Sequence, residues 1–192
     1  MMTEKKKKLE SLLNQPVLIK EVKDVIENSS SVLLYIKVFK QAEMYNRAYK
    51  LLESRMKERN DLSLISPMIM NLCFSIELLL KSFIFVEKKE TIDYVDLPNS
   101  ARNIHKHTYS VLFKKIEKEH QRNILSDLSQ RMGLPEINEG IFESILVAQN
   151  CDNSFAEWRY IFEQDGIKQL NIEFLVNLNE SLGTQLVRLT DR

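Results

Sequence analysis

The chain has 192 residues, of which 44% are apolar and 28% are charged, so it is long enough for one domain with a sizeable core and short for two. The chain has 27 basic residues (lysine plus arginine) and 27 acidic residues (aspartate plus glutamate). This balance excludes a strong overall electrostatic attraction to nucleic acid or to an anionic membrane, so any contact with nucleic acid has to use a local basic patch. Cys73 and Cys151 stand far apart without metal-type spacing, which argues against a disulfide framework and favours a reducing compartment.

Residues 1–29 are expected to form a helical appendage to a domain that occupies residues 30–192. The first residues show short helical patterns on either side of Pro16 and a basic run at residues 5–8. No apolar stretch of the length found in signal peptides follows the basic run. We therefore expect a cytoplasmic protein.

Long helices are predicted for the first half of the domain, because the few glycines and prolines fall between stretches of helical apolar periodicity. A serine cluster at residues 29–31 is suited to begin the first of them. Its apolar positions follow a three-to-four-residue repeat: Leu34, Val38, Ala42, Tyr45, Ala48 and Leu52.

The next helix is expected at residues 66–88, with Pro67 in its first turn, where proline is tolerated. It is apolar around most of its circumference, which predicts the central helix of a bundle. Polar and charged residues interrupt the apolar stretch, so a core helix is favoured over a membrane span.

The second half of the chain continues this pattern after a loop at about residues 91–106. Residues 107–132 are expected to be helical with one break and to end at Gly133 and Pro135, and a further helix is expected within residues 138–150. Residues 171–189 place apolar side chains on one slowly turning face: Phe174, Leu178, Leu182 and Leu186. The fold prediction is all-α, an up-and-down bundle of four to five long helices with short additional helices.

The segment CDNSFAEWRYIFEQDG, residues 151–166, places an arginine among aromatic side chains. Ser154 and Glu157 have the spacing of a capping box, which predicts a helix that begins at Ser154. Arg159 then lies near the N-terminal end of this helix, where a positive charge opposes the helix dipole. Its i+4 partner, Glu163, stands in the less favourable order for a helical ion pair.

Local helix energetics therefore do not explain Arg159, and two interpretations stay open. In one, Arg159 pairs with a carboxylate across the bundle, such as Glu77, and Trp158 fills the core. In the other, the guanidinium group binds an anion or stacks on a base.

Glu77 and Lys81 are one turn apart on the otherwise apolar central helix. Charges on such a helix have to be paired or reach solvent. They mark either an exposed edge of the helix or part of a polar site that also includes Arg159.

Three elements of the sequence resemble the HEPN family (higher eukaryotes and prokaryotes nucleotide-binding): SIELLLK at residues 75–81, HTY at 107–109 and WRYIFE at 158–163. The resemblance covers about residues 30–190. It implies a bundle of four or five helices, often dimeric, that handles RNA or nucleotides in bacterial defence or toxin–antitoxin systems, with RNA, a second copy or an antitoxin-type protein as partners. The ligand-binding residues that it implies are Glu77, Lys81, His107, Trp158, Arg159 and Glu163.

Catalytic members of the family cleave RNA with an Arg-x4–6-His motif, and Arg159 has no histidine at that spacing. Without an imidazole nearby, no group of suitable pKa is available to move the 2′-hydroxyl proton. A literal match, Arg102-x4-His107, lies instead between a loop and a helix start. The expected function is non-catalytic or degenerate HEPN-like binding of nucleotide or RNA. The alternatives are a metal-independent endoribonuclease that uses Arg102 and His107, and a dimeric protein–protein interaction module.

No metal or cofactor is expected. His105 and His107 lack a supporting cluster of cysteine or carboxylate ligands, and no glycine-rich phosphate loop is present. His120, among Lys118 and Glu119, is expected on a solvated helix face.

Overall fold

The computed structural model describes residues 34–88, 107–159 and 170–190, and these contain helices and connecting turns but no strand. The all-α prediction is therefore confirmed for the described part of the chain. The chain divides into two units, Met1–Val32 and Leu33–Arg192, and every described residue belongs to the second. The predicted N-terminal appendage lies outside the described residues.

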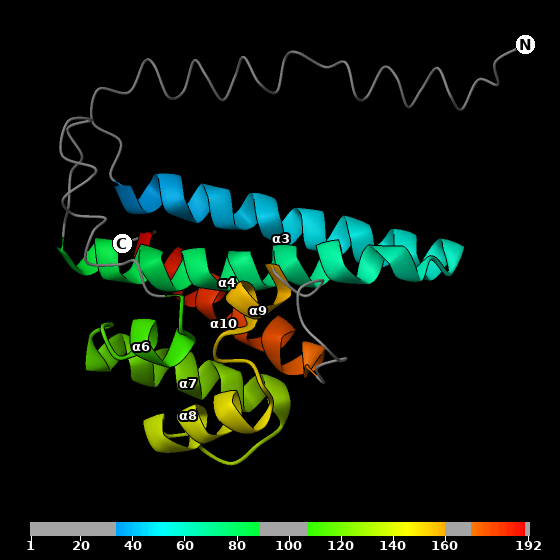
Figure 1. Cartoon of the computed structure of the whole chain (residues 1–192). Coiled ribbons are helices and arrows are strands. Elements are labelled where there is room, and N and C mark those ends of the chain that lie inside the picture. The colour runs from blue at the N-terminus through cyan, green and yellow to red at the C-terminus, as the bar shows by residue number, and fades with distance from the viewer. Residues whose placement is uncertain (1–33, 89–106, 160–169, 191–192) are drawn as a thin grey trace, which may run out of the picture. The chain divides into compact units, whose positions relative to one another are not determined.

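Helices α3 (Leu34–Arg59) and α4 (Ile65–Lys88) form an antiparallel pair joined by the short 3-10 turn η1 (Leu62–Leu64) (Figure 1). Asp61 begins the turn: its Oδ1 accepts hydrogen bonds from the Ser63 backbone N–H at 3.1 Å and from the Ser63 hydroxyl at 2.6 Å. These bonds stabilise the charged form and lower the pKa of Asp61. The cap allows the chain to reverse within a few residues.

α4 is the core helix, as its apolar circumference predicts. It packs against α3, α10 (Ile172–Thr190), α9 (Ser154–Arg159) and α6 (Tyr109–Phe113). Leu62–Val86 is long and apolar enough to span a membrane, but 72% of its most apolar window is buried inside the protein. A core helix accounts for that burial; the cytoplasmic location stays a prediction.

A buried polar link ties three helices together inside this core. The Ser75 hydroxyl of α4 donates to the Ala42 carbonyl of α3 at 2.9 Å and accepts from Asn179 Nδ2 of α10 at 2.8 Å. The predicted apolar face of α10 is confirmed, because Phe174, Leu178, Leu182 and Leu186 are all fully buried.

The predicted break in residues 107–132 is present between α6 and α7 (Lys118–Met132). The Gln121 side chain donates to the carbonyls of Phe113 and Ile116, at 3.0 and 2.7 Å, which satisfies backbone groups that the break leaves free. α7 ends at Gly133, which has a left-handed φ of 61° as helix-ending glycines often do.

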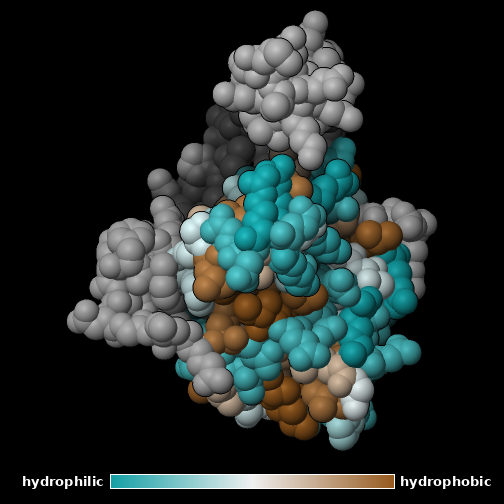
Figure 2. Space-filling view, turned by 90° about the vertical axis from the view of Figure 1, so that its right-hand side faces the viewer, coloured by the Kyte–Doolittle hydropathy of each residue, from teal (hydrophilic) through white to brown (hydrophobic). Residues whose placement is uncertain are grey.

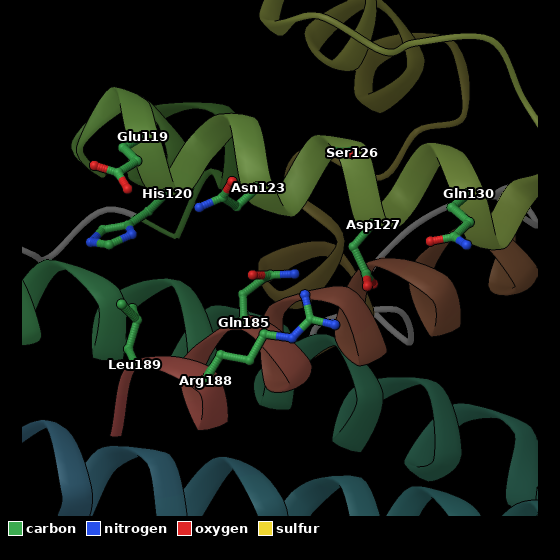
Figure 3. A pocket seen from close by; sticks show the side chains of 9 residues that line it. All are labelled: Glu119, His120, Asn123, Ser126, Asp127, Gln130, Gln185, Arg188 and Leu189. Atoms are coloured by element: carbon green, nitrogen blue, oxygen red, sulfur yellow. The ribbon is translucent and has the colours of Figure 1, made fainter. Parts of the chain in front are cut away.

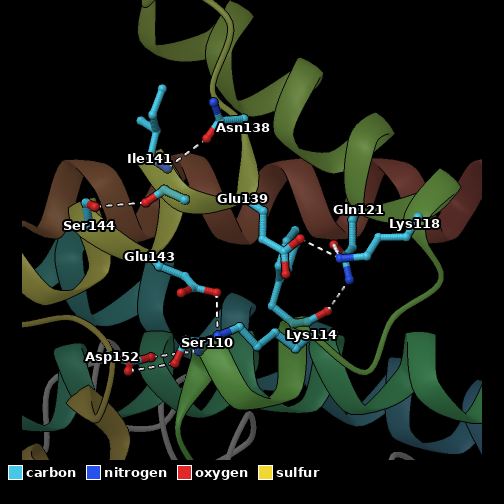
Figure 4. A network of polar contacts seen from close by, with 12 residues as sticks. Ser110, Lys114, Lys118, Gln121, Asn138, Glu139, Ile141, Glu143, Ser144 and Asp152 are labelled. Carbon is cyan, nitrogen blue, oxygen red and sulfur yellow. Dashed lines mark hydrogen bonds and ion pairs between the residues drawn. The ribbon is translucent and has the colours of Figure 1, made fainter.

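α8 (Glu139–Ala148) follows, with its first turn capped by Asn138, whose Oδ1 accepts from Ile141 N at 3.0 Å. Salt bridges hold α8 against the preceding helices (Figure 4): Lys114 contacts Glu143 at 2.7 Å, and Lys118 contacts Glu139.

Apolar side chains reach the surface in patches between hydrophilic regions on the face drawn in Figure 2. Among the described residues, the exposed large hydrophobic side chains are Met44, Leu51, Leu62, Met70, Leu134, Ile141, Val147 and Val187. They are scattered over several elements.

Candidate functional site

The candidate site is built around Glu77, a carboxylate in the middle of α4 that is only 1% exposed. Its Oε1 accepts from Lys81 Nζ at 2.6 Å, and its Oε2 lies 2.9 Å from His107 Nδ1. Burying a carboxylate costs several kcal/mol, on the order of 3–5, unless its oxygens are paired. Here both oxygens have a partner. The exposed-edge interpretation is wrong for Glu77, because the carboxylate is inside the protein.

His107 comes from the segment before α6, and a distant turn fixes that segment in place. The Asp152 carbonyl accepts from Tyr109 N at 2.9 Å, and the Asp152 carboxylate accepts from Ser110 N at 2.7 Å and from the Ser110 hydroxyl at 2.8 Å (Figure 4). Thr108 donates to Asn153 Oδ1 at 2.9 Å. Asp152 thus caps the start of α6, where Thr108 provides no side-chain cap.

Tyr109 connects the same segment to α4. Its hydroxyl donates to the Cys73 carbonyl at 2.7 Å, one turn before Glu77, and its ring is fully buried. Because Tyr109 is anchored at both its backbone and its hydroxyl, His107, two residues earlier, is held beside Glu77.

Aromatic rings line the other side of His107. Its imidazole ring lies 5.6 Å from the Phe155 ring of α9, measured between centroids. Phe155 stacks on Phe74 at 4.7 Å, and Phe74 contacts Tyr45 edge-on at 4.5 Å. Trp158, one turn after Phe155, is half-buried against the core. The imidazole therefore lies between a buried carboxylate and an aromatic cluster, and its side chain is 46% exposed.

The predicted capping box at Ser154 is wrong. α9 does begin at Ser154, but the Ser154 hydroxyl is fully buried and makes no hydrogen bond of good geometry. It lies close enough to Cys73 and Tyr109 to lower the pKa of both. Burial outweighs this effect: it raises the pKa of Cys73 to about 11 and that of Tyr109 well above its ordinary value. These groups stay protonated at neutral pH, and neither cysteine forms a disulfide.

The structure brings together three of the six residues that the family resemblance implies, Glu77, Lys81 and His107. Trp158 lies on α9, on the same helix as the ring that contacts His107. Arg159 is the last described residue of α9, and its side chain lies outside the described part; Glu163 and Arg102 lie outside it as well. A contact between Arg159 and Glu77 or Lys81 therefore stays a prediction.

Two chemical properties follow from the geometry of this site. A neutral imidazole that donates from Nδ1 to Glu77 keeps Nε2 as an acceptor, and a protonated one presents a second donor there. Lys81, with 17% of its side chain exposed, adds an ammonium group. Among the described residues no group of three histidine, cysteine or carboxylate side chains is placed to hold a metal ion.

No family model, curated protein or solved structure matches this chain. The function of the protein is therefore inferred from the site itself and from the sequence resemblance.

Proposed function

We propose that the protein binds RNA or nucleotides, without cleaving them, at the Glu77 cluster, which we define as Glu77, Lys81, His107 and Phe155. The observation that carries the proposal is the half-exposed imidazole of His107, which a buried carboxylate holds against an aromatic ring. A ring fixed in this way loses little side-chain entropy when a ligand contacts it.

The accessible ring of the cluster suits unpaired bases better than duplex phosphates. The half-exposed His107 imidazole, supported by the buried Phe155, can stack on a base, and single-stranded RNA is recognised largely through such stacking. Lys81 and His107 share the charge of Glu77, so the cluster itself attracts phosphate only modestly. Arg159, directly after Trp158 in sequence, is the residue that we expect to supply the phosphate contact.

Non-catalytic binding is supported by the absence of a histidine separated from Arg159 by four to six residues, since Gln164, Asp165 and Gly166 occupy these positions. The biological setting, bacterial defence or a toxin–antitoxin pair, is an expectation from the family resemblance.

Fluorescence anisotropy with labelled single-stranded RNA, and equilibrium dialysis with adenine nucleotides, test this function at low and moderate salt. We expect Arg159→Ala and His107→Ala to weaken binding by about tenfold each, and salt to weaken binding by the wild type. Arg122→Ala, an exposed arginine on α7, is the matched control and is expected to bind as the wild type does. Equal binding by all four proteins, or by none, contradicts the proposal.

One contact favours endoribonuclease activity as a second candidate. The Glu77 carboxylate orients the His107 imidazole as acidic partners orient catalytic histidines, which leaves Nε2 free to act as a general base. This candidate predicts RNA cleavage in the presence of a metal chelator, abolished in His107→Ala and reduced in Glu77→Gln. Undiminished cleavage by His107→Ala eliminates the site, and the Arg102→Ala variant tests the second half of the predicted motif.

A further inference from the structure

A second polar site lies between α7 and α10, and none of the residues that line it belongs to the Glu77 cluster. It is a pocket of about 320 Å³ that opens to solvent between the two helices (Figure 3). The residues that line it are Glu119, His120, Asn123, Ser126, Asp127, Gln130, Gln185, Arg188 and Leu189. Its volume falls in the range of small-molecule sites.

Gln185 is the residue that points to a ligand. Its side chain is only 7% exposed, and it makes no hydrogen bond with another described residue. Figure 3 shows its amide reaching from α10 toward α7, into the pocket. Its amide atoms are not among the fully buried polar atoms without a partner, so they reach the pocket, where solvent or a ligand has to satisfy their hydrogen bonds. A ligand group in the pocket would provide the missing partner.

The charges on either side of Gln185 indicate what the ligand carries. Arg188, one turn later on α10, forms no ion pair with a described residue. Asp127 lies opposite on α7, and its carboxylate faces the Arg188 guanidinium across the pocket (Figure 3). Arg131 Nε holds only one of its oxygens, Oδ2, at 2.5 Å. The pocket therefore offers a cation and a carboxylate oxygen at the same end.

The other end of the pocket is less charged. His120, which was predicted on a solvated helix face, is half-buried: its ring lies 6.0 Å from the Phe83 ring, measured between centroids, and it lines the pocket. Leu189 adds an apolar surface there, and Glu119 adds a second carboxylate. With two carboxylates in the lining, a polyanion such as a nucleotide is disfavoured.

We propose that this pocket binds a small zwitterion with a carboxylate and an ammonium group, of the α-amino acid class. Arg188 binds the carboxylate bidentately and Asp127 the ammonium. The amides of Gln185 and Asn123 bind the remaining polar atoms, and His120 and Leu189 contact the side chain. This site goes beyond the proposed RNA binding and is independent of it.

The experiment is a thermal-shift screen of the full chain against each proteinogenic L-amino acid, with inorganic phosphate and AMP as anion probes, followed by calorimetry. We expect at least one amino acid to raise the melting temperature and to bind about tenfold or more weakly to Arg188→Gln, which loses the bidentate contact. Gln185→Leu is expected to lower affinity as well. Arg122→Gln is the matched control. Arg122 is an exposed arginine on α7 that does not line the pocket, so this variant should bind as the wild type does.

Amide NMR of the wild type places the ligand, since the Gln185 side-chain NH₂ signal has to shift on binding. The proposal is overturned if no amino acid binds, if binding persists unchanged in Arg188→Gln, or if phosphate or AMP binds here in preference. None of the residues substituted here belongs to the Glu77 cluster. A loss of amino-acid binding in these variants should therefore leave RNA binding unchanged, and a loss of RNA binding in the Glu77 cluster variants should leave amino-acid binding unchanged.

Discussion

The Glu77 cluster and the α7–α10 pocket both place charged groups and nearby polar side chains at a boundary between helices, but they differ in how those groups are satisfied. Both carboxylate oxygens of the buried Glu77 have partners within 2.9 Å. In the pocket, Gln185 and Arg188 have no partner among the described residues. Removing one member of a buried pair destabilises the folded state, because its partner is left without a hydrogen bond or a counter-charge. A polar group without a protein partner can instead form its hydrogen bond or ion pair with a ligand. Substitution of the buried Glu77 should therefore affect stability strongly, whereas substitution of Gln185 or Arg188 should affect ligand binding more than stability.

The largest expected effect is the loss of stability in Glu77→Leu. This variant leaves Lys81 with 17% of its side chain exposed and without the carboxylate it pairs with. Removing one member of a buried pair costs about 3–5 kcal/mol, and we expect a loss of free energy of unfolding near the lower end, because Lys81 can turn toward solvent. Urea denaturation measures it.

Glu77→Gln provides the internal comparison, because the amide keeps a hydrogen-bond acceptor for Lys81 and should cost less. Glu119→Ala, an exposed carboxylate at the rim of the pocket, should change stability by less than about 0.5 kcal/mol. If Glu77→Leu were as mild as Glu119→Ala, the distinction between the two regions would fail.

A smaller effect is expected at alkaline pH, from the protonated groups beside Glu77. The pKa of Cys73 is raised from 9.0 to about 11, so the folded state holds its proton more tightly than the unfolded state. The stabilisation is complete below pH 9 and is lost as pH rises toward 11, by about 2–3 kcal/mol for a shift of this size. Tyr109, whose pKa is also raised, acts in the same direction.

Urea titrations at a series of pH values test this linkage through the slope of unfolding free energy against pH. Cys73→Ala is expected to show a shallower decline above pH 9, whatever its absolute stability. An identical slope in the two proteins would mean that the thiol does not titrate differently in the folded state.

The fold could be predicted from the sequence because its signals are local. The apolar circumference of α4, the buried face of α10 and the glycine at the end of α7 each lie within one helix, where periodicity and end signals operate. The ion pair between Glu77 and Lys81 is likewise local, because the two residues are one helical turn apart on α4.

The site was predicted less well because its contacts are long-range. The cap of α6 comes from Asp152, 42 positions away from Ser110, and no local pattern around α6 indicates it. Nothing in the spacing of Ser154 shows that its hydroxyl is buried beside Cys73. His120 was assigned to a solvated face from its charged sequence neighbours, which do not indicate its long-range ring contact with Phe83 on α4.

Apart from the Glu119→Ala control, the smallest stability change is expected for Gln185→Leu, and it separates the two regions most sharply. Since the Gln185 amide makes no hydrogen bond with a described residue, replacing it with an apolar group of similar size removes an unpaired polar group and gains apolar burial. The free energy of unfolding without ligand should stay the same or rise by up to about 1 kcal/mol, opposite in sign to Glu77→Leu. Gln121→Leu is the matched control: that glutamine is also buried but donates to two backbone carbonyls, so its loss should destabilise the protein by about 1–3 kcal/mol. Urea denaturation of the pair decides the matter, because comparable destabilisation in both would show that Gln185 already has a partner and that its pocket needs no ligand to satisfy it.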